Sequence, residues 1–385
     1  MTIIFDKSKK ISLDDESFRS ELLSIASKID DVIPLGRGDP DFHTPKHIVD
    51  AAKKALDDNK HHYTPPNGLP ELRFAISKNL LKKYNLNYSE NEIVVTAGVQ
   101  ESIALAMLSL LETGDEVLIT SPRFTTYDLN VRMCNAKPIP IPTYEKNNFS
   151  LMPEIIESKI NERTKVIVLV SPNNPTGAVT PPENIRKIAE IAIKHNLIVI
   201  ADEIYADLIY ENHQHLSIGT LENMKERTLT LNGFSKTYAM TGWRIGYGIW
   251  PKNLIQLATR LAINYHSCVS SISQFGGIAA LTGSQEPVRA MVAKFRERRD
   301  LIVNGLNQIP GFECPTPGGA FYAFPNIENT GYSSTELQND YLEKAGVAVI
   351  SGSSFGHFGE GYLRFSYANS HKKIIEAIER LKKFS

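Results

Sequence analysis

The residues best suited to chemistry lie around Lys236, in the segment 232–247. An apolar approach precedes this lysine, small and hydroxylated residues surround it, and Arg244 follows it. Partial burial and a neighbouring cation both lower the pKa of an amine, which makes its neutral form available as a nucleophile toward an aldehyde. The segment therefore predicts imine chemistry, although an isolated Ser-Lys pair is more often part of an ordinary solvated loop.

Two further charged residues stand in apolar surroundings. Asp202 ends the run 197–201, where a buried carboxylate is costly unless it meets a cation. Arg364 lies in the otherwise apolar run 362–367 and needs a partner for the same reason. The run before Asp202 is also similar to a nucleotidase strand that ends in acidic metal ligands, but no phosphate-loop lysine motif accompanies it. We therefore predict no metal site.

Apolar strands must position these residues. Strands are predicted at 92–96, 116–120, 136–141, 165–170, 197–201, 228–231 and 244–249, and helices at 13–29, 46–56, 71–83, 100–111 and 184–195. Continuous apolar runs that alternate with helices are typical of a largely parallel sheet buried on both faces. Ligands bind beyond the carboxyl ends of such strands, which is where Asn174, Asp202 and Lys236 fall.

Two turns that contain glycine can approach a ligand closely. Gly38 belongs to a turn-rich loop in which the absence of a side chain lets the backbone come near a bound molecule. At Gly98 a strand ends and a helix begins, and the outward-pointing amides of such a helix start form an anion site. A plain structural turn explains either piece equally well.

The pattern changes after about residue 287. A charged helix at 288–308 is followed by a helix at 334–345, strands at 347–350 and 362–367, and a terminal helix. These segments predict a compact α/β lobe. The sequence shows no internal repeat and no low-complexity linker.

Composition narrows the class of partner. The chain has 385 residues, 42% of them hydrophobic, and a net charge of −1, so neither nucleic acid nor a membrane surface is favoured and small molecules are expected. Cys134, Cys268 and Cys314 are odd in number and widely spaced, which argues against a disulfide framework or a zinc site. Together with an N-terminus that lacks a signal-peptide pattern, they predict a cytoplasmic protein.

Several separated motifs together resemble one family. They lie at 38–42, 63–68, 96–99, 173–177, 201–205, 232–247 and 364–366, in the family's order and over nearly the whole chain. The family is that of the fold-type-I pyridoxal-phosphate (PLP) enzymes, specifically the class I/II aminotransferases. The resemblance implies an α/β fold with a mostly parallel seven-stranded sheet. It divides the chain into an N-terminal arm at 1–45, a large PLP-binding domain at 46–286 and a small C-terminal α/β domain at 287–385.

The resemblance also assigns catalytic roles. Lys236 resembles the lysine that holds PLP as an imine and then, once freed, moves a proton between the substrate Cα and the cofactor's C4′. Asp202 matches the carboxylate that pairs with the protonated pyridine nitrogen. Tyr205 and Asn174 match donors to the cofactor's 3-oxygen, although each fits a purely structural role when taken alone.

The remaining matches concern phosphate and substrate. The cofactor phosphate is expected at Arg244, Ser235 and the amides of Gly98 and Val99, and the substrate at Gly38, Phe124, Asn174 and Arg364. Phe124 stands where the family places an aromatic residue on the cofactor ring, often tryptophan, so stacking is kept and the indole N–H is absent. Tyr63 resembles a tyrosine that reaches the neighbouring subunit's phosphate. We therefore expect a homodimer with shared active sites.

The predicted function is a ping-pong exchange of an amino group between an L-amino acid, such as aspartate or an aromatic amino acid, and a 2-oxo acid such as 2-oxoglutarate. A C–S β-lyase uses the same cofactor residues and stays open, as does a regulatory protein that binds PLP without turnover. Substrate choice is also open, because Val99 and Gln100 stand where some aspartate-preferring relatives carry a lysine. A second substrate carboxylate could be read by Arg37, Arg123 or His266, although solvated surface positions are the simpler interpretation of these three.

Overall fold

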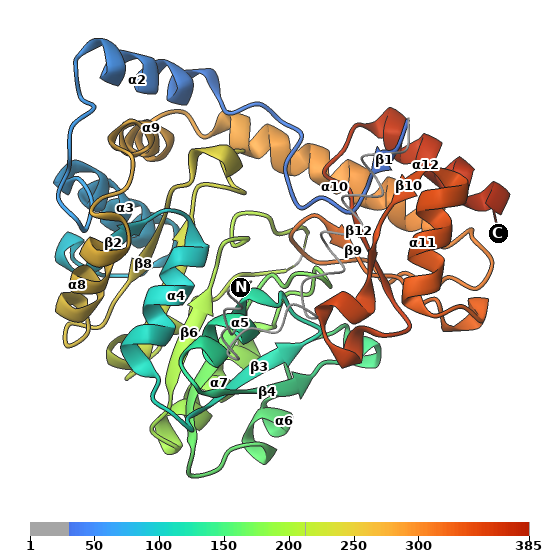
Figure 1. Cartoon of the computed structure of the whole chain (residues 1–385), viewed down its shortest axis with the longest axis horizontal. Helices are drawn as coiled ribbons and strands as arrows, with labels where there is room; N and C mark the ends of the chain where they lie inside the picture. Colours follow the sequence, from blue (N-terminus) through green and yellow to red (C-terminus); the bar gives the residue numbers. More distant parts are fainter. Residues whose placement is uncertain (1–30, 212, 385) are drawn as a thin grey trace, which may run out of the picture.

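A seven-stranded sheet forms the centre of the larger part of the molecule (Figure 1). The computed structural model describes residues 31–211 and 213–384. The strand order is β2-β8-β7-β6-β5-β3-β4, and only β8 within this sheet runs against its neighbours. The strands are β2 (Ile93–Thr96), β3 (Glu116–Ser121), β4 (Lys137–Pro142), β5 (Thr164–Val170), β6 (Ile198–Asp202), β7 (Thr228–Gly233) and β8 (Gly246–Ile249). The predicted mostly parallel sheet is confirmed.

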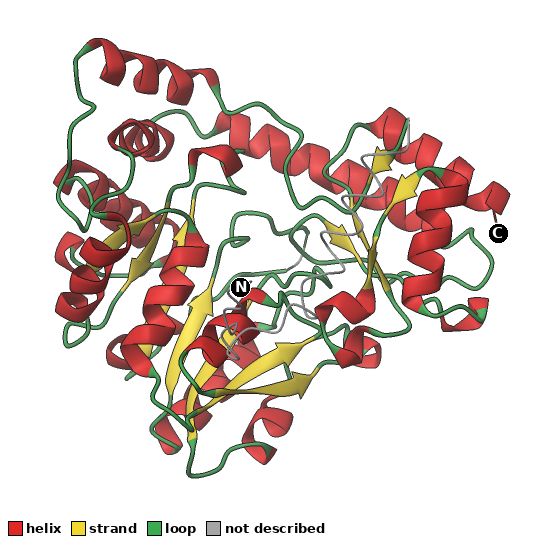
Figure 2. Cartoon of the chain, viewed as in Figure 1, coloured by secondary structure: helices red, strands yellow, loops and turns green. Residues whose placement is uncertain are grey.

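Both faces of this sheet are covered by helices (Figure 2). Along β5, Val166, Val168 and Val170 join one buried cluster, whereas Ile167 and Leu169 join another. Because successive strand residues point to opposite faces, these clusters lie on opposite sides of the sheet. This is why the strands are apolar at nearly every position instead of alternating with polar residues.

The helices of this part include four that the sequence did not predict. The predicted ones are α2 (Lys46–Asp57), α3 (Pro70–Tyr84), α4 (Val99–Leu110) and α7 (Pro182–Lys194). The others are α5 (Thr126–Met133), α6 (Pro153–Ser158), α8 (Ile255–His266) and α9 (Ser271–Thr282). Helices α4, α5 and α8 pack with the strands in one cluster, and α6 and α7 in the other. The helix predicted at 13–29 lies outside the described residues.

A second group of elements contains the predicted C-terminal lobe. It consists of α10 (Glu286–Leu306), α11 (Ser334–Ala345), α12 (His371–Phe384), the antiparallel sheet β11-β12-β9, and β10 (Val347–Ala348). The sheet strands are β9 (Tyr322–Ala323), β11 (Ile350–Ser351) and β12 (Leu363–Ser366). A strand from the start of the described chain, β1 (Ile33–Pro34), pairs in parallel with β10. Segments at opposite ends of the sequence therefore share one core.

Most predicted elements differ from the structure by one or two residues at an end, and two strands differ in a further way. The strand expected to start at Arg244 starts at Gly246, because Arg244 has a φ of 51° and belongs to the preceding turn. The strand expected at 347–350 is interrupted, and β10 and β11 pair in different sheets. Among the helices of the described residues, none is long and apolar enough to cross a membrane.

Candidate active site

Four parallel strands bring the predicted site residues to one edge of the sheet. Phe124 follows β3, Asn174 follows β5, Asp202 ends β6 and Lys236 follows β7. Carboxyl ends of parallel strands meet at the same edge, so residues far apart in the sequence become neighbours. This placement agrees with the one predicted from the sequence.

Lys236 lies between this edge and the loop after β1. Its Nζ donates a hydrogen bond of 2.6 Å to the carbonyl of Gly38 and lies 5.7 Å from the centre of the Phe321 ring. Burial, together with Arg364 and Arg244, lowers the pKa of Lys236 to about 8, whereas Asp39 and Asp202 oppose the shift. A substantial fraction of the amine is therefore neutral near physiological pH.

Asp202 is buried and accepts two hydrogen bonds. One comes from the phenol of Tyr127 and the other, at 3.1 Å, from the amide of Ile204. Burial raises the pKa of Asp202 to about 6, and the two donors and Lys236 act against that rise. The carboxylate is therefore ionised at neutral pH and has lone pairs left for a further donor.

The turn before α4 has the features of an anion site. Gly98 caps the helix with a φ of 87°, and a Cβ added there would lie 2.5 Å from a guanidinium nitrogen of Arg244. Arg244 donates to the carbonyls of Thr241 (2.9 Å) and Ala97 (3.3 Å), which holds its planar group against the turn. The helix amides from Val99 onward and the guanidinium thus converge, and only glycine at position 98 leaves room for both.

Arg364 is buried and held by neutral acceptors. Its Nη1 donates to Asn174 Oδ1 at 2.9 Å and its Nη2 to the carbonyl of Gly36 at 2.6 Å. The rings of Tyr322 and Phe355 lie 4.6 and 4.8 Å from its Cζ. The strand β12 therefore delivers a fixed cation beside Asn174, and aromatic surfaces fix its plane.

Tyr322 was missed by the sequence analysis and joins several predicted residues. Its hydroxyl lies 2.9 Å from that of Tyr205, and it packs so closely against Gly38 that a Cβ there would collide with it. Tyr127 was also missed, although it follows Phe124 closely in the sequence. In the sequence, each of these two tyrosines is only an aromatic residue near other predicted site residues. Their hydrogen-bond partners, Tyr205 and Asp202, are 117 and 75 positions away, so the local sequence does not reveal these contacts.

Three predicted residues show a mixed outcome. Ser235 is buried next to Lys236, and Phe124 is half-buried at the edge of the sheet cluster. Tyr63 is 89% exposed in the single chain, in the loop before α3. The exposure of Tyr63 therefore sets it apart from Ser235 and Phe124.

The three residues considered for a second substrate carboxylate have partners of their own. Arg37 pairs with Asp39 and is exposed, as predicted for a surface residue. Arg123 pairs with Asp128 and is buried. His266 lies 3.3 Å from Glu101 with both side chains largely buried, so the surface interpretation is wrong for Arg123 and His266.

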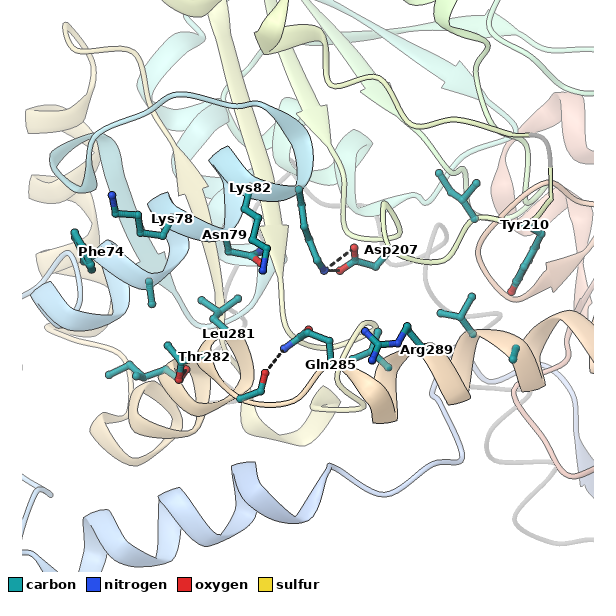
Figure 3. Close-up of a pocket in the computed structure, with 18 of the residues that line it drawn as sticks. Phe74, Lys78, Asn79, Lys82, Asp207, Tyr210, Leu281, Thr282, Gln285 and Arg289 are labelled. Carbon is teal, nitrogen blue, oxygen red and sulfur yellow. Dashed lines mark hydrogen bonds and ion pairs between the residues drawn. The ribbon is translucent and has the colours of Figure 1, made fainter.

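A separate pocket of about 850 Å³ lies between α3 and α10 (Figure 3). Its lining includes Phe74, Lys78, Leu281 and Arg289, and also Lys83 and Asp207, which form an ion pair at 2.9 Å. None of the predicted site residues lines it. This pocket is therefore distinct from the residues at the sheet edge.

The residues at the sheet edge fit PLP. An amine with a lowered pKa suits its aldehyde, a buried carboxylate with free lone pairs suits its ring nitrogen, and a helix start with an arginine suits its phosphate. The glycine at position 98 leaves space where a side chain would obstruct the arginine. The aldehyde, the ring nitrogen and the phosphate of PLP each have a matching group in this set.

Comparisons with known proteins agree with this geometry. The family model "Aminotransferase class I and II" matches residues 30–381. An aspartate aminotransferase of Pyrococcus horikoshii is 44% identical over 94% of this chain and 93% of its own, and aromatic-amino-acid aminotransferase 2 of Thermococcus litoralis is 37% identical over 98% and 97%. The crystal structure of an aromatic aminotransferase from Pyrococcus horikoshii superposes with a TM-score of 0.90 at 39% identity, covering 94% of this chain and 98% of that one.

A match of this length includes the strands, the turn before α4 and the lysine segment in a single alignment. It accounts for the fold and for the kinds of residue that meet at the sheet edge. The chain belongs to the class I and II aminotransferases, PLP-dependent enzymes that move an amino group between an amino acid and a 2-oxo acid.

Proposed function

We propose that Lys236, Asp202 and Tyr205 perform the chemistry of this aminotransferase. The observation that carries the proposal is the position of Lys236, whose amine has a pKa of about 8 and is under the electrostatic influence of Asp202, Arg244 and Arg364. One lysine thus lies among an anion for a ring nitrogen, a cation for a phosphate and a cation for a substrate carboxylate. No such convergence is required by a structural lysine.

The cofactor residues act by holding charges in fixed positions. PLP, when bound, supplies an aldehyde that takes up the amino group and a ring that accepts electrons from the substrate Cα. Asp202 accepts the ring N–H, Tyr205 and the amide nitrogen of Asn174 donate to the 3-oxygen, and Phe124 stacks on the ring. Gly98, Val99, Ser235 and Arg244 bind the phosphate, supported by the amides and guanidinium that converge there.

Lys236 is the base that carries the proton. Its Nζ would move a proton from the substrate Cα to C4′ of bound PLP, a short transfer that needs the amine to be neutral. Its lowered pKa supports this role. The carbonyl of Gly38, 2.6 Å away, orients the amine between transfers.

Arg364 binds the substrate α-carboxylate. Two N–H groups of its guanidinium donate to neutral acceptors, the side chain of Asn174 and the carbonyl of Gly36. A carboxylate binds a guanidinium more strongly than such acceptors do, because it accepts two parallel hydrogen bonds and carries a charge. Gly38 and Asn174 line the same position. The substrate Cα is then held within reach of Lys236.

For the donor we propose aspartate, an aromatic amino acid or a related L-amino acid, with 2-oxoglutarate as acceptor. The names of the relatives support this range. Arg37 and Arg123 are each engaged by an aspartate of the same chain, which disfavours them as readers of a second carboxylate.

The proposal includes a homodimer whose active sites are shared. A tyrosine that is 89% exposed in a single chain, as Tyr63 is, supports a contact with a second copy. We also propose the division at 1–45, 46–286 and 287–385, supported by the pairing of β1 with β10. The three cysteines of the sequence, none of them in a C-x-x-C spacing, favour the cytoplasm.

The test is to replace Lys236 and to follow absorbance. The wild type incubated with PLP is expected to turn yellow and to lose that absorbance when an amino donor is added alone, and borohydride is expected to label Lys236. K236A is expected to lose at least about 1,000-fold in kcat, because it lacks both the anchor and the base. Lys252→Ala, a change at an exposed lysine after β8, is the control and keeps full activity.

Three results would contradict parts of the proposal. Borohydride labelling of another side chain would exclude Lys236 as the anchor. Pyruvate and ammonia from cystathionine, without formation of the aminated cofactor, would indicate the C–S β-lyase. Bound cofactor with no turnover of any donor in a panel of amino acids would indicate the regulatory protein.

A further inference from the structure

The turn that precedes α4 is held by a buried pair of side chains outside the predicted site. Glu101 lies in the first turn of α4, and its Oε2 accepts a hydrogen bond of 2.5 Å from the amide of Ala97. On the other side of the same residue, the carbonyl of Ala97 accepts from Arg244 at 3.3 Å. Both the amide and the carbonyl of Ala97, the residue directly before Gly98, are thus held by hydrogen bonds.

His266 faces Glu101 from the end of α8. Its Nε2 lies 3.3 Å from Glu101 Oε2, the two side chains are only 13% and 12% exposed, and both ring nitrogens are buried. A carboxylate is favoured in the first turn of a helix, and an imidazole that is protonated is favoured in the last turn. Glu101 and His266 are therefore buried neighbours, close enough to form an ion pair when the imidazole is protonated.

A lone carboxylate at this place would disfavour the proposed ligand. Glu101 is one helical turn from Gly98, and the phosphate of PLP carries close to two negative charges near neutral pH. In a partly buried setting, repulsion between like charges is weakly screened. His266 offsets that repulsion while Glu101 keeps the Ala97 peptide in place.

We propose that Glu101 and its counter-ion His266 are positioning residues that shape the phosphate-binding turn for a dianion. The inference rests on the proposed placement of the cofactor phosphate at Gly98, Val99 and Arg244. It adds two residues that touch neither the cofactor nor the substrate. Their effect is confined to the recognition of phosphate and does not extend to the aldehyde or the ring.

The test compares PLP with pyridoxal, which lacks the phosphate. For each variant the apo-protein is titrated with both compounds, imine absorbance gives both dissociation constants, and the ratio of pyridoxal Kd to PLP Kd measures recognition of phosphate. Glu101→Ala removes the acceptor that fixes Ala97, and we expect PLP Kd to rise about tenfold with pyridoxal Kd unchanged. Phosphorus NMR of bound PLP is expected to show a shifted or broadened resonance in the same variant.

A second variant keeps the inference testable if E101A does not fold. His266→Ala leaves the carboxylate without its counter-ion, so the same ratio is expected to fall. In the double variant the ratio of pyridoxal Kd to PLP Kd is expected to be no lower than in the single variant with the lower ratio, because both side chains act through one turn. A wild-type ratio in E101A, or in H266A where E101A does not fold, would overturn the inference.

Two controls separate this inference from its premises. Glu116→Ala is matched, since Glu116 is buried, accepts from Asn161 at 2.7 Å and pairs with Arg163 at 3.0 Å, but begins β3 at the opposite end of the strand. We expect it to lower stability and to leave the ratio unchanged. Arg244→Gln should lower the ratio; if it does and E101A does not, only the present inference fails, and if neither does, the phosphate does not bind at this turn.

Discussion

At the scale of single residues, Tyr127 controls the charge of Asp202. Its phenol donates to the carboxylate, and this hydrogen bond lowers the pKa of Asp202 against the effect of burial. In Tyr127→Phe that pKa rises further, so more of the carboxyl is protonated at neutral pH and cannot accept the ring N–H. We expect kcat/KM to fall about tenfold at pH 7 and less at pH 8.5, measured as the rate of the half-reaction with the amino donor.

Tyr88→Phe is the matched control for this change. Tyr88 is equally buried, but within the described residues its hydroxyl has no hydrogen-bond partner. Its replacement is expected to leave kcat/KM and its pH dependence as in the wild type. Equal losses at every pH in Y127F would show that the hydroxyl acts on packing and not on the charge of Asp202.

The pH dependence of cofactor capture is a direct readout of Lys236. Burial lowers the pKa of this amine to about 8 from its ordinary value of 10.5. Since only the neutral amine attacks the aldehyde, the rate of PLP capture by the apo-protein is expected to rise with pH up to about 8 and then to level off. Stopped-flow absorbance from pH 6 to pH 10 checks this. A rate that continues to rise to pH 10 would show an amine with an ordinary pKa.

Sequence motifs identified the residues whose type is rare in its setting. Lys236, Asp202 and Arg364 are charged groups next to apolar runs, so the sequence alone marks them as unusual. Tyr322 and Glu101 are ordinary in their local sequence. Their importance comes from partners brought near by the fold, such as Tyr205 and His266, and no periodicity encodes such contacts.

At the scale of elements, the turn between β2 and α4 limits the residue at position 98. Gly98→Ala places a Cβ 2.5 Å from the guanidinium of Arg244 and forces a side chain into a φ of 87°. We expect Arg244 to be displaced and the dissociation constant of PLP to rise about tenfold or more, measured by titration of the apo-protein.

Gly114 separates backbone strain from crowding. It has a similar φ of 94°, but a Cβ there meets no atom within 4 Å. Gly114→Ala is therefore expected to cost about 1–2 kcal/mol of stability and to leave PLP binding unchanged. Equal effects of the two substitutions on PLP affinity would mean that Arg244 does not bind the phosphate.

The sequence predicted the buried strands within one to a few residues, because a sheet covered on both faces imposes continuous apolar runs. Helix α9 was missed for a physical reason. It contains Gly276 and Gly277, which oppose helix formation in isolation, but a Cβ at Gly276 would lie 2.6 Å from the ring of Trp243. Close packing requires these glycines, and the same glycines make the helix hard to recognise. The local sequence does not reveal that packing.

At the scale of the whole molecule, the loop after β1 joins the two groups of elements at the site. Gly36 accepts from Arg364 of the C-terminal group, and Gly38 accepts from Lys236 of the large sheet. Farther along the loop, Asp41 forms a two-bond pair with Arg298 of α10 at 2.6 and 3.1 Å. Arg364 and Lys236 are therefore held in register by one segment of backbone.

Subunit mixing tests whether a second chain completes the site. K236A is expected to be inactive because it lacks the lysine. If Tyr63 of one subunit serves the phosphate of the other, Tyr63→Ala is expected to bind PLP at least about tenfold more weakly. When the two variants are unfolded, mixed and refolded, about half of the dimers are hybrids, and in each hybrid one of two sites has both Lys236 and Tyr63 intact. Activity at low PLP is therefore expected to recover to about a quarter of the wild-type value. Activity of the mixture no greater than the average of the two variants, from a species that remains dimeric in light scattering, would show that each chain forms its site alone.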